Sequence, residues 1–207
     1  MAKLPDPVPE IRPDTPLYEA VGRFVTSYAH AEAAIHMLAR HLSGLSDQKA
    51  RIVFGGMRLP DLSDIVRRFI KIDKLPQATQ DTVDSCLTQL ILIGKRRHSL
   101  VHRSTHVFDN RMTVTNVLTT KSLKAIETEF FEVQELSDMQ SDCGLIYLRL
   151  DEIYSPPLIT GEDKYWRPWL YKHVPPKTPN LKPRATPAEE QEPPPPSSPE
   201  RSGKTEG

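Results

Sequence analysis

An arginine and a histidine near the end of a long helical pattern carry the most distinctive chemistry in the chain. Arg97 and His102 are separated by four residues, within a basic stretch at residues 95–103. An arginine can hold a phosphodiester through two parallel hydrogen bonds and stabilise the charge of a phosphorane-like transition state. A histidine can take a proton from a 2′-hydroxyl group or give one to a leaving oxygen. Together the two residues have the chemistry of a ribonuclease that needs no metal.

The helix predicted around this pair places the arginine where an aliphatic side chain is expected. Residues 77–103 follow a heptad-like seam, made of Val83, Leu87, Leu90, Gly94, Arg97 and Val101. Residues 90–93 are four consecutive apolar residues, which makes the helix apolar around nearly its whole circumference there, so we expect this helix to be the central one. Five positions on an ideal helix correspond to a rotation of about 140°, so Arg97 and His102 do not converge from one straight helix. They could meet at an irregular helix end, or across the two-fold axis of a homodimer.

The rest of the sequence predicts a mainly α fold, a helical bundle with a small β-hairpin appendage. No proline lies between Pro76 and Pro156, which suits long helices because proline removes an amide donor. Hydrophobic spacing predicts the other helices at residues 16–43, 47–54, 61–73 and 133–154. A period of two predicts a hairpin at residues 105–118 and a further strand at 125–131.

The helix order and the motif resemble the HEPN superfamily of small helical bundles. The likeness rests on Ala31-Glu32 inside the aromatic-aliphatic seam of the first helix, and on the Arg-x4-His motif that ends a later one. It covers residues 15–155. The family includes metal-independent endoribonucleases, toxins of toxin–antitoxin and phage-defence systems, and members without activity. The resemblance implies that Arg97 and His102 are catalytic and that Glu32 orients Arg97 from the facing helix. His98 stands where the family commonly has a polar residue, often asparagine.

Three other interpretations of these residues remain open. Arg97 and Glu32 could form an ion pair that only fixes helix register. His102 could be an ordinary histidine that complements a helix C-terminus. His98 and His102, four positions apart, could bind a metal ion together with His106 or Glu32. No His-Glu-x-x-His pattern accompanies them, so we expect neither a metal nor another cofactor. The remaining basic residues of the stretch are expected to be solvated or to make weak phosphate contacts, and these are Lys95, Arg96 and Arg103.

Composition limits the partners and the compartment. The 27 lysines and arginines balance 27 aspartates and glutamates, so RNA, as a possible partner, would need a local patch. Cys86 and Cys143 lie far apart without the spacing of metal ligands. The first residues contain no apolar signal core, and no apolar run is long enough to span a bilayer. The sequence therefore predicts a cytoplasmic protein that does not bind membranes.

Proline and charge dominate both ends of the chain. Residues 1–14 are predicted to be a flexible leader, and residues 156–207 a disordered, proline-rich tail. The tail contains an aromatic block with Tyr165, Trp166 and Trp169. This block either folds back onto an apolar patch of the bundle or binds a protein partner. The second possibility gives an alternative function, a non-catalytic homodimeric interaction module with a partner-binding tail.

Overall fold

The computed structural model describes residues 15–108, 111–155 and 167–172. In these residues the chain forms five α-helices, a short 3-10 helix (Leu123–Ala125) and three strands. The helices are α1 (Thr15–Ser43), α2 (Asp47–Phe54), α3 (Leu59–Ile72), α4 (Gln77–His102) and α5 (Val133–Tyr154). The strands are β1 (Ser104–Phe108), β2 (Arg111–Thr115) and β3 (Thr128–Phe131). Every predicted helix is present, with ends within two residues of the prediction. The predicted leader lies outside the described residues.

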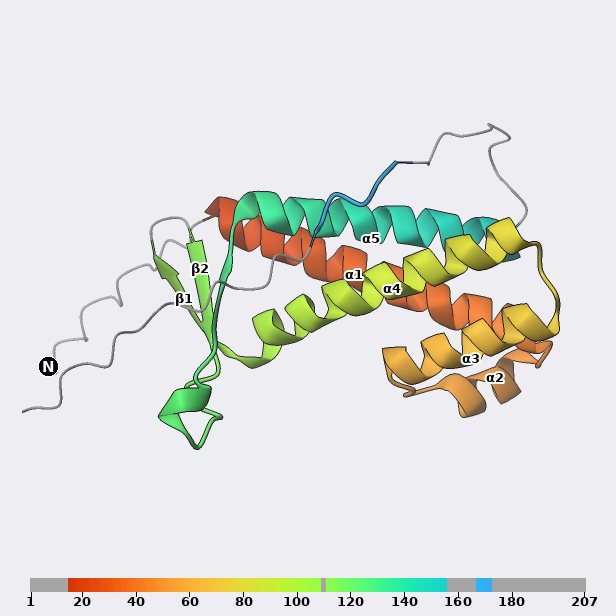
Figure 1. Ribbon diagram of the computed structural model, residues 1–207, viewed down its shortest axis with the longest axis horizontal. Helices are drawn as coiled ribbons and strands as arrows, with labels where there is room; N and C mark the ends of the chain where they lie inside the picture. The colour runs from red at the N-terminus through yellow and green to blue at the C-terminus, as the bar shows by residue number, and fades with distance from the viewer. Residues whose placement is uncertain (1–14, 109–110, 156–166, 173–207) are drawn as a thin grey trace, which may run out of the picture. The chain divides into compact units, whose positions relative to one another are not determined.

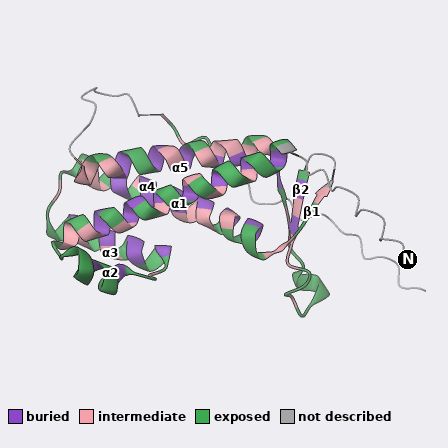
Figure 2. Cartoon of the chain, turned by 180° about the vertical axis from the view of Figure 1, so that it is seen from behind, coloured by how far each residue is buried: buried purple, intermediate pink, exposed green. Residues whose placement is uncertain are grey.

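The centre of the bundle is the pair formed by α1 and α5, which run side by side, while α4 lies across them (Figure 1). The expectation that α4 would be the central helix is therefore wrong. Ile91 and Leu92 of α4 are only partly buried, because one side of α4 packs against other helices and the opposite side does not. The residue spacing of α1 predicts a seam of eight residues, and six of them form its buried stripe: Leu17, Phe24, Tyr28, Ala31, Ile35 and Leu38 (Figure 2). The other two, Val21 and Leu42, are partly buried.

The sheet packs against the bundle and contributes to its core. Its strand order is β1-β2-β3, with both pairs antiparallel. Met112 and Val114, on one face of β2, are buried together with Phe131 of β3, the partner of Met112. The predicted hairpin and the further strand are thus both present. The face of the sheet that carries Met112, Val114 and Phe131 is buried in the core, so the strands are part of the folded domain and not a separate appendage as predicted. The residues that join β1 and β2, Asp109 and Asn110, lie outside the described residues.

A short segment late in the chain, residues 167–172, has no regular secondary structure and packs on α4 and α5, and we call it the strap. Asp142 of α5, which has 0% exposure, accepts hydrogen bonds from the backbone amides of Leu170 (3.0 Å) and Tyr171 (2.9 Å). Its carboxylate also pairs with Arg167 at 2.9 Å. The indole of Trp169 donates to Ser85 Oγ of α4 at 3.1 Å. This part of the aromatic block folds back onto the bundle, so the prediction of disorder throughout residues 156–207 does not hold for the strap. Tyr165 and Trp166 lie outside the described residues.

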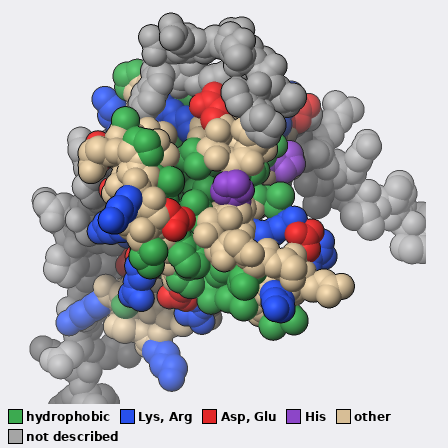
Figure 3. All heavy atoms as spheres, turned by 90° about the vertical axis from the view of Figure 1, so that its right-hand side faces the viewer, with side chains coloured by type: hydrophobic (Ala, Val, Ile, Leu, Met, Phe, Trp, Pro, Cys, Tyr) green, Lys and Arg blue, Asp and Glu red, His purple; other side chains and the backbone are tan. Residues whose placement is uncertain are grey.

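Charges are mixed on the described surface, and the two cysteines are buried. Basic and acidic side chains are interspersed on the face shown in Figure 3, consistent with the zero formal net charge. Both cysteines, Cys86 and Cys143, are free, and burial raises the pKa of each thiol to about 12. No helix among the described residues has both the length and the apolar character to cross a membrane.

Candidate functional site

The predicted catalytic pair lies on the last two turns of α4. The helix runs unbroken from Gln77 to His102, and the amide of Arg103 still bonds to the carbonyl of Ser99 at 3.2 Å. The irregular helix end that could have brought Arg97 and His102 together is therefore not present. The two side chains project about 140° apart around the helix axis, as ideal geometry requires. Within one chain, no hydrogen bond or ring contact joins the two side chains in the described structure.

Arg97 points toward α1 and is half-buried there. Its guanidinium carbon lies 5.7 Å from the ring centroid of Tyr28, within the range of a cation–π contact. Its Nε atom is buried without a hydrogen-bond partner. Among the described residues Arg97 forms no ion pair, so the alternative of a register-fixing pair with Glu32 is not observed. The guanidinium lies against an aromatic face, and no other described residue accepts a hydrogen bond from it.

Tyr28 of α1 lies close enough to both Glu32 and Arg97 for their charges to affect the pKa of its phenol. Burial raises the pKa of its phenol, the nearby Glu32 carboxylate raises it further, and the Arg97 guanidinium opposes both. The hydroxyl therefore stays protonated at neutral pH. Glu32 and Arg97 thus act electrostatically on the same ring without touching each other, and Glu32 does not orient Arg97 directly in the single chain.

Gly94 allows this close approach between α1 and α4. A Cβ atom at Gly94 would lie 2.8 Å from the Tyr28 hydroxyl oxygen, closer than packed atoms come. Gly94 therefore leaves the space that the Tyr28 side chain occupies, and the ring of Tyr28 contacts Arg97.

Substituting alanine at two helical glycines tests this contact. We expect Gly94→Ala to lower the free energy of unfolding by about 1 kcal/mol, because overpacking costs more than the gain in helix propensity. Gly144→Ala in α5 is the matched control, since a Cβ there meets nothing within 4 Å. It should stabilise the protein by about 0.5–1 kcal/mol. Urea denaturation measures both, and equal effects of the two substitutions would contradict the contact.

The two histidines of the motif are exposed on the outer side of α4. The imidazole rings of His98 and His102 are 4.7 Å apart between centroids and tilted by 47°. Val101, between them in sequence, is 45% exposed although it continues the predicted seam. His102 is the last residue of the helix, as expected for a histidine that complements a helix C-terminus. No group of three or more metal-binding side chains occurs in the described chain, so neither His106 nor Glu32 completes a site with the pair.

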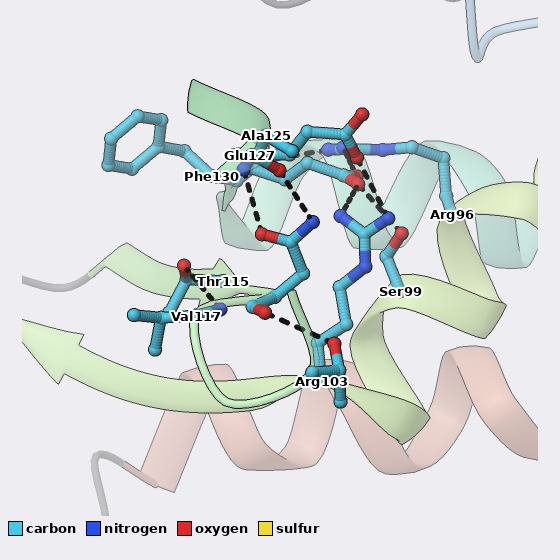
Figure 4. Close-up of polar contacts among 11 residues, drawn as sticks. Arg96, Ser99, Arg103, Thr115, Val117, Ala125, Glu127 and Phe130 are labelled. Atoms are coloured by element: carbon cyan, nitrogen blue, oxygen red, sulfur yellow. Dashed lines mark hydrogen bonds and ion pairs between the residues drawn. The ribbon is translucent and has the colours of Figure 1, made fainter. Parts of the chain in front are cut away.

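Arg96, the neighbour of Arg97, has an unexpected role, since we predicted that it would be solvated. It is 9% exposed, and its guanidinium carbon lies 4.0 Å from the ring centroid of Phe131. It pairs with Glu129 and bonds to Glu135 at 2.7 Å. It also donates to the carbonyl of Phe130 at 2.8 Å (Figure 4). Burial raises the pKa of the Glu135 carboxyl, and Arg96 opposes that shift. Arg96 is thus a structural link between α4, β3 and α5.

Arg103 and Ser99 extend the same network to the end of the helix. Arg103 bonds to Glu129 and Glu127, both at 3.0 Å, and Ser99 Oγ donates to Glu129 at 2.7 Å (Figure 4). Arg103 is therefore not a free phosphate contact, and the prediction of a solvated residue is wrong for it as well. Lys95 is exposed as predicted. The network fixes the orientation of the helix end on which His98 and His102 stand.

Similarity to known proteins gives no further guide to the site. Comparison with models of protein families, with curated proteins and with solved structures yields no match to this chain.

Proposed function

We propose that this protein is a metal-independent endoribonuclease of the HEPN type, in which two copies of the chain assemble each active site. Arg97 binds the scissile phosphate, and His102 transfers protons to and from the 2′-hydroxyl and the leaving oxygen. His98 lies beside His102 as a second polar side chain, and Glu32 is available to contact the partner's groups or the RNA.

The observation that supports this proposal is that Arg97 is half-buried without an acidic partner among the described residues. A half-buried arginine normally has an acidic partner, because an unpaired charge in a poorly solvated place is costly. Arg96 follows that rule, with Glu129 and Glu135 beside it. Arg97, one position further, has only the face of Tyr28 among the described residues. An anion such as an RNA phosphate would supply the missing partner.

The geometry of α4 is the reason for proposing a homodimer. Arg97 faces α1 and His102 faces outward, so a single chain cannot place both on one phosphate. The exposed surface of His98, Val101 and His102 combines an apolar side chain with two histidines. In the proposed dimer, the partner chain approaches the Arg97 side of α4 with its own His102, so that each phosphate meets Arg97 of one chain and His102 of the other.

The proposal is tested with purified protein and RNA. We expect cleavage of single-stranded RNA that continues in excess EDTA and leaves 2′,3′-cyclic phosphate or 3′-phosphate ends, the products of attack by the 2′-hydroxyl. The protein should elute as a dimer on size-exclusion chromatography with light scattering. Intact RNA both with and without added divalent ions would reject the nuclease.

The alternative of a partner-binding tail is less favoured. Trp169, the described tryptophan of the aromatic block, already contacts Ser85, and Arg149 lies 4.7 Å from its ring centroid. A protein partner that used this tryptophan would have to displace the strap from the bundle.

A further inference from the structure

The last turn of α4 presents two imidazoles in an arrangement suited to a metal ion. His98 and His102 are four positions apart and share one face of the helix. Two histidines with this spacing on one helix are the metal-binding part of known zinc motifs. Both side chains are exposed, and among the described residues neither has a hydrogen bond or ion pair that would have to be broken.

The distance between the rings agrees with a shared ion. Zinc binds imidazole nitrogen at about 2.0–2.1 Å in tetrahedral geometry, which places two ligand rings about 5 Å apart between centroids. The observed separation is 4.7 Å with a tilt of 47°. Small rotations of the side chains would therefore be enough to bring one nitrogen of each ring to the ion.

The charges around the pair do not prevent cation binding. Of the basic neighbours, Arg96 and Arg103 are paired with three carboxylates, those of Glu127, Glu129 and Glu135. Arg97 is turned away toward Tyr28 of α1. Lys95, three positions before His98, is exposed and adds one positive charge on the same side of the helix. The positive charge that the sequence suggests at this helix end is thus reduced by pairing but not removed, and imidazole nitrogens bind a cation as neutral ligands.

We propose that His98 and His102 form a two-histidine chelate for a divalent ion of the zinc, nickel and copper class, and that the bound ion inhibits the nuclease. These ions prefer imidazole ligands, whereas magnesium and calcium prefer oxygen. With no third protein ligand in the described chain, water fills the remaining positions. The inhibition rests on the proposed function, because the ion occupies the His102 nitrogen that would otherwise transfer a proton. The binding itself does not depend on that function.

Calorimetric titration of zinc chloride into the untagged full-length chain tests the chelate directly. We expect one zinc ion per chain in wild type, and a loss of affinity on the order of 100-fold in His98→Ala and in His102→Ala, because removing a ligand costs at least as much as removing its supporting groups. His41→Ala removes an exposed histidine of α1 and is the matched control, which should bind like wild type. Circular dichroism confirms that each variant is folded. Zinc binding that is unchanged in His98→Ala would overturn the proposal.

Cleavage assays distinguish this inference from the proposed function. If the chain cleaves RNA, zinc should inhibit it and EDTA should restore the full rate. Zinc binding to both histidines without any RNA cleavage would support the chelate and reject the nuclease. RNA cleavage that zinc leaves unaffected would retain the nuclease and reject the inhibitory ion.

Discussion

Alanine at Arg97 is expected to reduce RNA cleavage by about 10²–10³-fold, the usual cost of losing one group that stabilises transition-state charge. The free energy of unfolding should stay within about 1 kcal/mol of wild type, because the side chain contributes a cation–π contact but, in the described structure, no ion pair. Arg97→Lys should restore only part of the activity, since an ammonium group cannot make two parallel hydrogen bonds to a phosphate. Single-turnover cleavage and urea denaturation measure the two effects separately.

Mixing two inactive variants tests whether the site is shared between chains. His102→Ala should also lose activity, by about 10²–10⁴-fold, as expected for a general acid–base residue. In a dimer of one Arg97→Ala chain and one His102→Ala chain, one of the two sites has both wild-type residues. Co-refolding equal amounts should therefore recover about a quarter of the wild-type rate, because half of the dimers are mixed and half of their sites are intact.

Two results would contradict this arrangement. Activity of Arg97→Ala equal to that of Lys95→Ala, a substitution of an exposed neighbour, would show that Arg97 has no special role. Two variants that are inactive alone and remain inactive when mixed in a dimer would place both residues in one chain, against the geometry of α4.

Most of the fold follows from local patterns that a single sequence displays. The hydrophobic spacing of α1 and the caps and breaks at its end determine where it begins and ends. Gly44, with φ of 63°, adopts the left-handed conformation expected of a glycine just after a helix. The ends of α2 and α5 agree with the predicted ones for the same reason, because helix periodicity and its interruption are both local.

The roles of adjacent arginines could not be assigned from such patterns. Helical periodicity placed Arg97 on the seam and left Arg96 facing solvent. The partners of Arg96 lie 33 residues away at Glu129 and 39 residues away at Glu135. They approach only after β3 has paired with β2 and packed beside α4. A contact of this kind depends on tertiary structure and has no signal in the local sequence.

The role of Asp142 could not be predicted from local sequence patterns either. It lies beside Cys143 on the apolar side of α5, where periodicity alone offers no reason for a carboxylate. The reason is the strap, whose amide donors are 28 and 29 residues further along the chain. The composition of the tail predicted disorder, but a buried acceptor on the bundle gives one short segment of it a fixed position.

Replacing Asp142 with asparagine is expected to destabilise the fold by about 3 kcal/mol or more, although the two side chains have nearly the same size. Among the described residues, four donors bond to the carboxylate, namely the amides of Leu170 and Tyr171 and the side chains of Arg167 and Gln89. An asparagine presents an NH₂ group to some of these donors, which leaves them buried without an acceptor. Breaking a buried charged network by changing one member typically costs 3–5 kcal/mol. Urea denaturation measures the loss.

Asp138→Asn is the matched control on the same helix. Its carboxylate accepts one exposed hydrogen bond, from Gln134 at 2.8 Å, so the substitution should change stability by less than about 0.5 kcal/mol. In a chain that ends at Ser155 and lacks the strap, Asp142→Asn should have little effect, because three of the four donors are gone. The difference between the two backgrounds is the coupling energy between Asp142 and the strap. An equal effect in both backgrounds would mean that the carboxylate stabilises α5 independently of the strap, and that the strap is not held by Asp142.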